Sequence, residues 1–271
     1  MRRLSVTIAV LLAVMPGLLG GQGSPGREKS STVQPRAASQ KEYNDYHAAL
    51  GSGSGATLEQ VAAAFAVKYP QSELRKYLFG RAMSQYQREN NAEGMLAMGD
   101  KVLSLDPGDT LALVLTATVL ADSLGPTDPD RDRKIAEVKK NVNRVIQDTT
   151  ASLVGQAVAP RVALYRGTLE GMAYSALGLV HLKTGDYEEA EKDLKAAVDL
   201  CKPKPDPSIW YHLALAQDHR RKFRAALNSV EQALQLASSN PELQKMAETE
   251  HERLNGFVKN SPDSGETRPP D

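Results

Sequence analysis

The chain has 271 residues, and its 33 Lys and Arg residues balance its 33 Asp and Glu residues, so the formal net charge is zero. A neutral charge disfavours nucleic-acid binding, which usually comes with a clear basic excess. One cysteine, Cys201, excludes an intramolecular disulfide framework and a cysteine-rich zinc module. Aromatic residues make up only 5% of the chain, which favours helices packed through small side chains over a β-sandwich.

The first residues have the pattern of an export signal. A pair of arginines precedes the uncharged, largely apolar stretch 4–19, and residues 21–23 (GQG) offer a small-x-small cleavage site. An uncleaved membrane anchor is the alternative, because such a stretch almost spans a bilayer. Pro16 and the glycines after it favour cleavage. We therefore predict a signal peptide at residues 1–23 and an exported, periplasmic or secreted protein, held at the membrane only if the signal stays uncleaved.

Two further stretches lack an apolar period. Residues 24–40 and 259–271 are rich in Ser, Gly and Pro. Such segments cannot bury enough apolar surface to offset the entropy lost on ordering. We predict a disordered linker and a disordered tail there, with the folded region at 41–258.

An internal repeat is clearest in the C-terminal half. The segment that starts at Gly171 aligns with the segment that starts at Pro207, at an offset of 36 residues. Each copy has the pattern of two apolar-periodic helices joined by a polar turn, and small residues let the two helices approach closely. The matched positions are Tyr174 and Trp210, Leu177 and Leu213, Gly178 and Ala214, Tyr187 and Phe223, Ala190 and Ala226, Leu194 and Val230, and Ala197 and Ala233.

Capping residues mark the predicted helix starts. Asp186 is expected to cap the second helix of the first copy, with Glu189 as its capping-box partner. Asp206 followed by proline supplies a cap and a first-turn proline for the second copy. Asn240 followed by proline does the same for a final helix.

The spacing aromatic-x2-Leu-small, followed by Ala in the second helix, resembles the tetratricopeptide repeat. His181 and Gln217 depart from it, since the family often has Tyr there. The resemblance implies an all-α, right-handed solenoid of stacked antiparallel helix pairs, clearest over residues 171–204 and 207–240. The residues that match the signature are Tyr174, Leu177, Gly178 and Ala190 in the first copy and Trp210, Leu213, Ala214 and Ala226 in the second.

The resemblance continues upstream with less agreement. Phe79 and Tyr86 open another such copy, although Gly94 and Gly99 in its second helix each cost about 1 kcal/mol relative to Ala. The same apolar positions recur 34 residues later, from Leu113. Five helix pairs and a terminal helix are enough for a stable solenoid. The other predicted helices are 42–50, 57–68, one after Pro129 that reaches about residue 147, a long one at 160–183 and a polar terminal one at 241–258.

Sequence motifs for catalysis and for metal binding are absent. The chain has no G-x-S-x-G, no G-x4-G-K-[ST] and no H-E-x-x-H. His212 and His219 lie on similar sides of one predicted helix, but a zinc site usually needs a third close ligand. We therefore expect neither a metal site nor a cofactor.

Acidic pairs and the lone cysteine also fit structural roles better than catalysis. Glu188 and Glu189 open a predicted helix, where negative charge is favourable, and Glu248 and Glu252 lie on a polar helix face. Cys201 has no adjacent activating motif. We predict no catalytic residue and no enzymatic activity.

Residues 219–224 (HRRKFR) form a basic turn between the two helices of the second copy. The simplest interpretation is a solvated turn, with Phe223 packed into the core of the helix pair. The alternative is contact with an anionic partner, such as a peptide carboxylate, a lipid head group or a polyanion.

The function implied by the resemblance is a non-catalytic scaffold of the cell envelope that binds a protein or peptide partner in the concave groove. The alternative is an exported enzyme, or an enzyme accessory, whose solenoid frames a glycan or peptide site. A deep pocket that holds a carboxylate of raised pKa would favour the alternative. The sequence shows no such carboxylate in an apolar, helix-facing position.

In the family, ligands meet the inner face formed by the first helix of each pair. Leu111 and Leu179 also share that face, and the alternative of packing only against neighbouring helices applies above all to these two residues and to Leu215. Tyr211 is the expected anchor, because Trp210 takes the core position and the next residue turns about 100° away; packing against the preceding repeat is the alternative. The candidate groove residues are Tyr77, Ser84, Arg88, Val114, Thr118, Met172, Ser175, Leu182, Ser208, Tyr211, Leu215 and His219.

Overall fold

A computed structural model of the protein describes residues 36–151 and 160–260. The predicted signal peptide, and most of the predicted linker and tail, lie outside these residues. The described residues contain α-helices, one short 3-10 helix and no β-strand. The helices are α1 (Gln40–Ala49), α2 (Gly55–Lys68), α3 (Leu74–Arg88), α4 (Ala92–Leu105), α5 (Thr110–Ser123), α6 (Arg131–Ala151), α7 (Pro160–Thr184), α8 (Tyr187–Leu200), α9 (Pro207–His219), α10 (Phe223–Leu236), η1 (Ala237–Ser239) and α11 (Pro241–Asn260).

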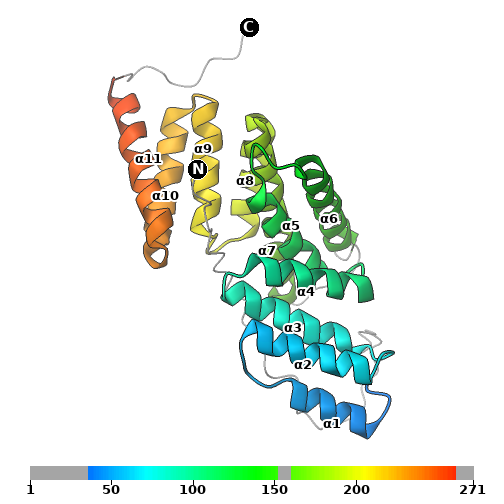
Figure 1. Cartoon of the computed structure of the whole chain (residues 1–271). Helices are drawn as coiled ribbons and strands as arrows, with labels where there is room; N and C mark the ends of the chain where they lie inside the picture. The colour runs from blue at the N-terminus through cyan, green and yellow to red at the C-terminus, as the bar shows by residue number, and fades with distance from the viewer. Residues whose placement is uncertain (1–35, 152–159, 261–271) are drawn as a thin grey trace.

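The helices stack in chain order into a solenoid, with α1 and α11 at opposite ends (Figure 1). Within the described part of the chain, extensive contacts join each helix to the next helix or the next but one. Such short-range contacts are the mark of a repeat architecture, in which each unit packs only on its neighbours. The all-α solenoid of helix pairs is therefore confirmed, and it includes the long helix α7 and the terminal helix α11.

Three clusters of buried side chains form the core. The largest runs from α1 to α7, a second joins α8 to α9, and a third joins α9, α10 and α11. Helix α5 lies deepest, because α4, α6 and α7 all pack on it. Its Val114 and Leu115 are completely buried, as expected for a helix that is apolar on nearly all sides.

Helix α9 starts at the predicted cap. The carboxylate of Asp206 accepts a hydrogen bond from the Ser208 amide at 2.8 Å, and proline stands in the first turn. Asn240 likewise accepts from the Leu243 amide at 3.1 Å at the start of α11. Both contacts satisfy amide groups that a helix start leaves without partners.

The predicted cap at Asp186 is wrong. Asp186 precedes α8, but its side chain makes no capping hydrogen bond. Its amide instead donates to the carbonyl of His181 at 2.9 Å, across a turn in which Gly185 has φ of 85°. This closure of α7 leaves Asp186 with ψ of 69°, whereas the capping Asp206 has the more extended value of 132°.

Glycine in α4 has a packing role that outweighs its low helix propensity. A Cβ atom on Gly94 would lie 2.5 Å from the ring of Tyr86. The glycine therefore lets α3 and α4 approach over a buried aromatic ring. The helix forms despite the two glycines that weighed against it in the sequence.

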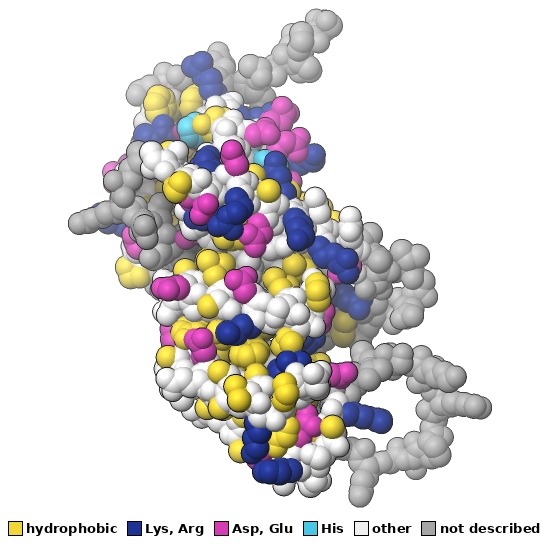
Figure 2. Space-filling view, turned by 45° about the vertical axis from the view of Figure 1, so that its right-hand side comes forward, with side chains coloured by type: hydrophobic (Ala, Val, Ile, Leu, Met, Phe, Trp, Pro, Cys, Tyr) yellow, Lys and Arg dark blue, Asp and Glu magenta, His cyan; other side chains and the backbone are white. Residues whose placement is uncertain are grey.

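The outer surface carries both signs of charge. On the face shown in Figure 2, acidic and basic side chains are interspersed, and hydrophobic side chains gather over the lower half, which α1 to α4 form. This mixture agrees with the zero net charge of the chain. No described helix has the length and apolar character needed to cross a membrane.

Candidate binding pocket

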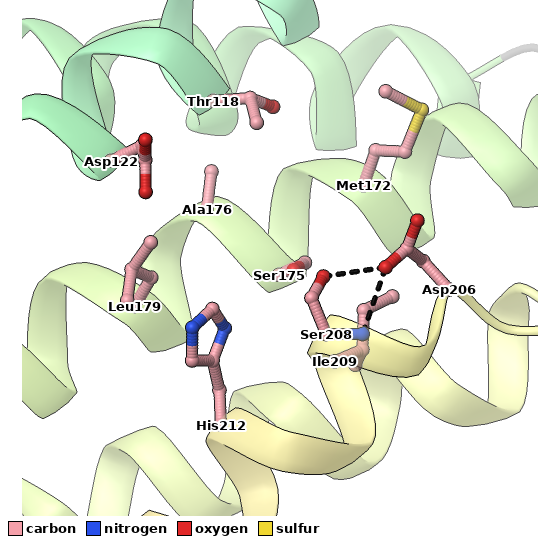
Figure 3. Close-up of a pocket in the computed structure, with 10 residues that line it drawn as sticks. All are labelled: Thr118, Asp122, Met172, Ser175, Ala176, Leu179, Asp206, Ser208, Ile209 and His212. Carbon is pink, nitrogen blue, oxygen red and sulfur yellow. Dashed lines mark hydrogen bonds between the residues drawn. The ribbon is translucent and has the colours of Figure 1, made fainter. Parts of the chain in front are cut away.

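Three helices that come first in their pairs, α5, α7 and α9, surround a pocket. Helix α7 contacts both α5 and α9, so it forms the floor between two walls (Figure 3). The pocket is partly open and has a volume of about 50 Å³. Its lining residues are Thr118 and Asp122 from α5, Met172, Ser175, Ala176 and Leu179 from α7, and Asp206, Ser208, Ile209 and His212 from the start of α9.

The floor follows from helical spacing. Met172, Ser175, Ala176 and Leu179 are three or four residues apart, so they share one face of α7. Three of these side chains are apolar, and the hydroxyl of Ser175 is the polar group among them (Figure 3). The floor therefore suits the apolar part of a bound side chain.

Asp122 brings a carboxyl group to one end of the pocket. It lies in the last turn of α5 and is half-buried, and this burial raises its pKa. The nearby Lys183 partly offsets that effect. With the described residues, the Asp122 carboxylate makes neither a hydrogen bond nor an ion pair.

Lys183 is held by backbone rather than by the Asp122 carboxylate. Its Nζ donates to the carbonyl oxygens of Ala121 at 3.0 Å and of Asp122 at 2.6 Å. These carbonyls belong to the end of α5, where a cation is favourable. Burial lowers the pKa of Lys183.

His212 enters the pocket from α9, with Ala176 and Leu179 of α7 between it and Asp122 (Figure 3). Its Nδ1 atom is covered by protein and has no hydrogen-bond partner among the described residues. Burial, with a smaller contribution from Lys183, lowers the pKa of His212 to about 4. The ring is therefore neutral at neutral pH.

Asp206 and Ser208 close the other end. Asp206 accepts hydrogen bonds from the Ser208 amide at 2.8 Å and from the Ser208 hydroxyl at 2.6 Å (Figure 3). The same carboxylate oxygen takes both, so it fixes the first turn of α9 as well as the pocket edge. The Asp206 carboxylate thus caps the start of α9, whereas the Asp122 carboxylate caps none of the described helices.

Four of the predicted groove residues line this pocket, and they are Thr118, Met172, Ser175 and Ser208. Leu179, which shares their face, also lines it. Groove residues predicted on three separate helices therefore meet in one pocket. Their role in binding stays a prediction.

The structure corrects two of the predicted groove residues. Val114 has no exposed surface, because it faces the core around α5, so it cannot contact a partner. Tyr211 does not turn away from the core: it is half-buried against the cluster of α9, α10 and α11, and burial raises its pKa. This cluster joins α9 to α10 and α11, which follow it in the chain, so the contact differs from the alternative of packing against the preceding repeat.

The other predicted groove residues lie outside the pocket lining. On α3, Tyr77 is 40% exposed and lies beside Lys76, whose Nζ is 5.0 Å from the ring centroid. Leu182 packs against the core, and His219 is exposed and stacks on the ring of Tyr187, with centroids 4.1 Å apart. The half-buried Ser84, the exposed Arg88 and the half-buried Leu215 complete the set.

Sequence reasoning missed Asp122 and His212, although a signal for both was present. Asp122 lies one helical turn after Thr118, and His212 lies one turn after Ser208. Residues four apart share a helix face, so extending the predicted inner face by one turn would have found both. Asp122 is also the half-buried carboxyl of raised pKa that the sequence did not reveal.

The basic turn between α9 and α10 is ion-paired rather than simply solvated. Glu191 on α8 is almost completely buried, and its Oε2 lies 2.6 Å from Arg220 Nη1 and 3.0 Å from Lys222 Nζ. Lys195 Nζ lies 2.6 Å from its other oxygen. Two cations of the turn thus bind the preceding repeat, which weakens the case for an anionic partner. Phe223 packs on the third core cluster, as expected.

Metal binding and thiol chemistry find no support in the described residues. They contain no group of three His, Cys, Asp or Glu side chains placed to hold a metal ion. Cys201 packs against the second core cluster, and burial raises its pKa to about 11. The thiolate needed for nucleophilic attack is therefore disfavoured.

A second and larger hollow, of about 560 Å³, lies beside α1 and the turn between α2 and α3. Its lining mixes basic and acidic side chains, among them Arg36, Lys68, Glu42 and Glu73. None of the predicted groove residues contributes to it. The pocket between α5, α7 and α9 is therefore the better candidate for a site on the inner face.

The helices of the C-terminal half match a known repeat family. Residues 169–239 match the family model described as Tetratricopeptide repeat, and this range covers most of α7 and all of α8, α9 and α10. Residues 169–239 therefore contain tetratricopeptide repeats. No curated protein matches the chain. Among solved structures, the MamA RS-1 ArsTM double mutant is similar at 19% identity with a TM-score of 0.40, over 70% of this chain and 97% of its own.

Proposed function

We propose that the protein is a protein-interaction scaffold that binds a peptide segment of a partner on the inner face formed by α5, α7 and α9. Tetratricopeptide repeats generally serve as modules for binding other proteins. The observation that supports the site is the pocket itself, because four residues predicted for the groove from three separate helices line it. The pocket replaces Tyr211 as the expected anchor point.

The size of the pocket supports binding rather than catalysis. An enzyme site was expected to combine a deep pocket with a carboxylate of raised pKa, and Asp122 meets the second condition. The volume of about 50 Å³ falls far short of the roughly 300–1,000 Å³ of small-molecule sites. A pocket of this size suits one side chain of an extended peptide.

A location in the cell envelope is part of the proposal and rests on the sequence of residues 1–23. Mass spectrometry of the protein from its native cells tests it, and we expect a mature N-terminus near Gly23. An intact Met1 on protein in the cytoplasm would contradict export. An intact N-terminus in the membrane fraction would favour the anchor.

The binding face is tested by site-specific cross-linking. A photo-reactive amino acid at Ser175 lies in the pocket, and the same amino acid at Lys192, on the exposed face of α8, is the control. We expect a discrete cross-linked partner from Ser175 and not from Lys192. The partner, once purified, should bind the wild-type protein directly.

A pocket-filling variant completes that test. Ser175→Trp should abolish binding of the purified partner and leave the melting temperature nearly unchanged, because Ser175 is only half-buried. Lys192→Trp adds the same ring outside the pocket and should bind normally. Equal binding by both variants would contradict the proposed face.

A further inference from the structure

The charged groups that line the pocket are all acidic. Asp122 and Asp206 lie toward its two ends (Figure 3), and among the described lining residues none is Lys or Arg. Asp206 is engaged by Ser208, whereas Asp122 has no contacting counter-ion in the part of the chain that the structure describes. A half-buried carboxyl group without a partner is costly, and a bound cation would relieve that cost.

Lys183 is not the cation that pairs with the Asp122 carboxylate. It is the basic group that acts on Asp122 from within the protein, but it lies outside the pocket lining, and its Nζ is bound by two backbone carbonyls. The carboxylate of Asp122 therefore keeps its hydrogen-bonding capacity for a group that enters from the pocket.

His212 gives a second, independent sign of a ligand. The buried ring has no hydrogen bond to the described residues, and it is neutral at neutral pH, so it does not repel a cation. Its Nδ1 is covered by protein, and the ring lines the pocket. A neutral imidazole nitrogen can accept a hydrogen bond from an ammonium or guanidinium group.

The rest of the lining matches an aliphatic chain. Met172, Ala176, Leu179 and Ile209 supply apolar atoms between the two carboxylates. Lys and Arg side chains bury their methylene stems along such surfaces while the charged head reaches a polar group. The pocket thus offers apolar atoms to the methylene stem of a long basic side chain and a carboxylate to its charged head.

We propose that the pocket receives a lysine or arginine side chain of the bound peptide, with its stem on the apolar residues of α7 and its cationic head at Asp122, on the side of the pocket that His212 also lines. This inference rests on the proposed function, because it names the chemistry of the partner at the same site. It also separates this groove from one that clamps an acidic peptide, since such a clamp would need basic residues in the lining.

Three blocked pentapeptides test the charge preference. They share the form acetyl-Ala-Ala-X-Ala-Ala-amide, where X is lysine, norleucine or glutamate. Norleucine keeps most of the lysine stem without the charge, and glutamate reverses the charge. The readout is the titration of methyl resonances from Met172, Ala176, Leu179 and Ile209 in the purified protein, since these methyl groups report binding at the pocket itself.

We expect the lysine peptide to bind about tenfold more tightly than the norleucine peptide and the glutamate peptide to bind most weakly. Asp122→Asn should bring the lysine peptide to within about twofold of norleucine, because it removes the charge and keeps the shape. Asp100→Asn makes the same change of net charge on the exposed face of α4 and should keep the full preference.

The outcomes separate this inference from the proposed function. Equal binding of the lysine and norleucine peptides, or an unchanged preference in Asp122→Asn, would overturn the inference and leave the pocket as a binding site. A glutamate peptide that binds best would overturn it as well. If no peptide perturbs the methyl groups while the Ser175 cross-link is also absent, the proposed site itself fails.

Discussion

Helix pair α7–α8 and helix pair α9–α10 have matched residues 36 positions apart, but they use different chemistry at the same places. In α7–α8, His181 Nδ1 lies 2.9 Å from Asp193 Oδ2. In α9–α10, the corresponding Ser229 hydroxyl donates to Gln217 Oε1 at 2.7 Å. Each pair therefore has a side-chain hydrogen bond between its helices at this position, ionisable in the first pair and neutral in the second.

The apolar contact between the two helices of each pair also uses different residues at matched positions. Gly178 packs against Leu194 in the first pair, and a Cβ atom on this glycine would lie 2.7 Å from Leu194 Cγ. The second pair has Ala214 and Val230 at these positions, and both are completely buried. Leucine opposite glycine in the first pair thus corresponds to valine opposite alanine in the second. The side chain is smaller on one helix and larger on the other, so the number of side-chain carbon atoms at the contact stays the same.

The pairs differ most where they meet the next helix. Glu191 in α8 binds the basic turn of the second pair, whereas the matching Leu227 in α10 packs on the apolar cluster shared with α11. Contacts within a helix pair therefore occur at the same positions in both repeats. Contacts between neighbouring pairs differ, because they depend on which helix follows in the chain.

The largest expected effect comes from Trp210, which packs against both the second and the third core cluster. Trp210→Ala should lower the free energy of unfolding by about 3–5 kcal/mol. The matching Tyr174→Ala should cost less, since Tyr174 packs against the second cluster. Urea unfolding of both variants measures this, and equal losses would show that the two positions are equivalent.

Glu191→Gln should lower the free energy of unfolding by about 2 kcal/mol at pH 7, because it leaves three cations around a neutral group. The cations are partly exposed, so the cost stays below that of a fully buried pair. Glu189→Gln, which breaks a surface pair on the same helix, is the control and should have little effect. A comparable loss in both variants would contradict the special role of Glu191.

The same residue predicts a dependence on pH. Burial alone would raise the pKa of Glu191, but hydrogen bonds from Lys195 and Lys222 outweigh it and hold the pKa at about 2. A carboxylate of lowered pKa stabilises the fold above its unfolded pKa of 4.5, and this stability is lost as the pH falls toward 2. Glu191→Leu, which copies the second pair, should flatten the acid side of the stability curve measured by urea unfolding.

Gly178→Ala should destabilise the protein by about 1–2 kcal/mol, because the clash with Leu194 exceeds the gain in helix propensity. The double variant Gly178→Ala and Leu194→Val reproduces the second pair and should recover most of that loss. Thermal unfolding of the single and double variants checks this. No recovery in the double variant would show that the exchange of volume is not the feature that matches the two pairs.

The smallest change in the free energy of unfolding is expected at the hydrogen bond between His181 and Asp193. Asp193→Ser should cost about 1 kcal/mol, since it separates the partners of a partly buried hydrogen bond. Adding His181→Gln rebuilds the contact of the second pair and should bring the free energy of unfolding to within about 0.5 kcal/mol of wild type. A double variant that is less stable than Asp193→Ser alone would mean that the ionisable pair is required in its own repeat.

The sequence predicted the helices well, including the long helix from Pro160 and the helix after Pro129. It failed at Asp186, where the backbone closes α7 and leaves the cap unused. It also failed at Tyr211, whose direction depends on α11. Helix periodicity is a local property, whereas the environment of one side chain depends on the neighbouring helix.

The sequence by itself determined the repeat and the order of the helix pairs, because both follow from residues three, four or 36 positions apart. Only the tertiary structure decided that α5, α7 and α9 form a pocket, and that the Asp122 carboxylate and His212 Nδ1 share it without a hydrogen-bond partner among the described residues. These groups lie some ninety residues apart in the chain. Their burial, and with it the shift of each pKa, arises only when three helices pack around them.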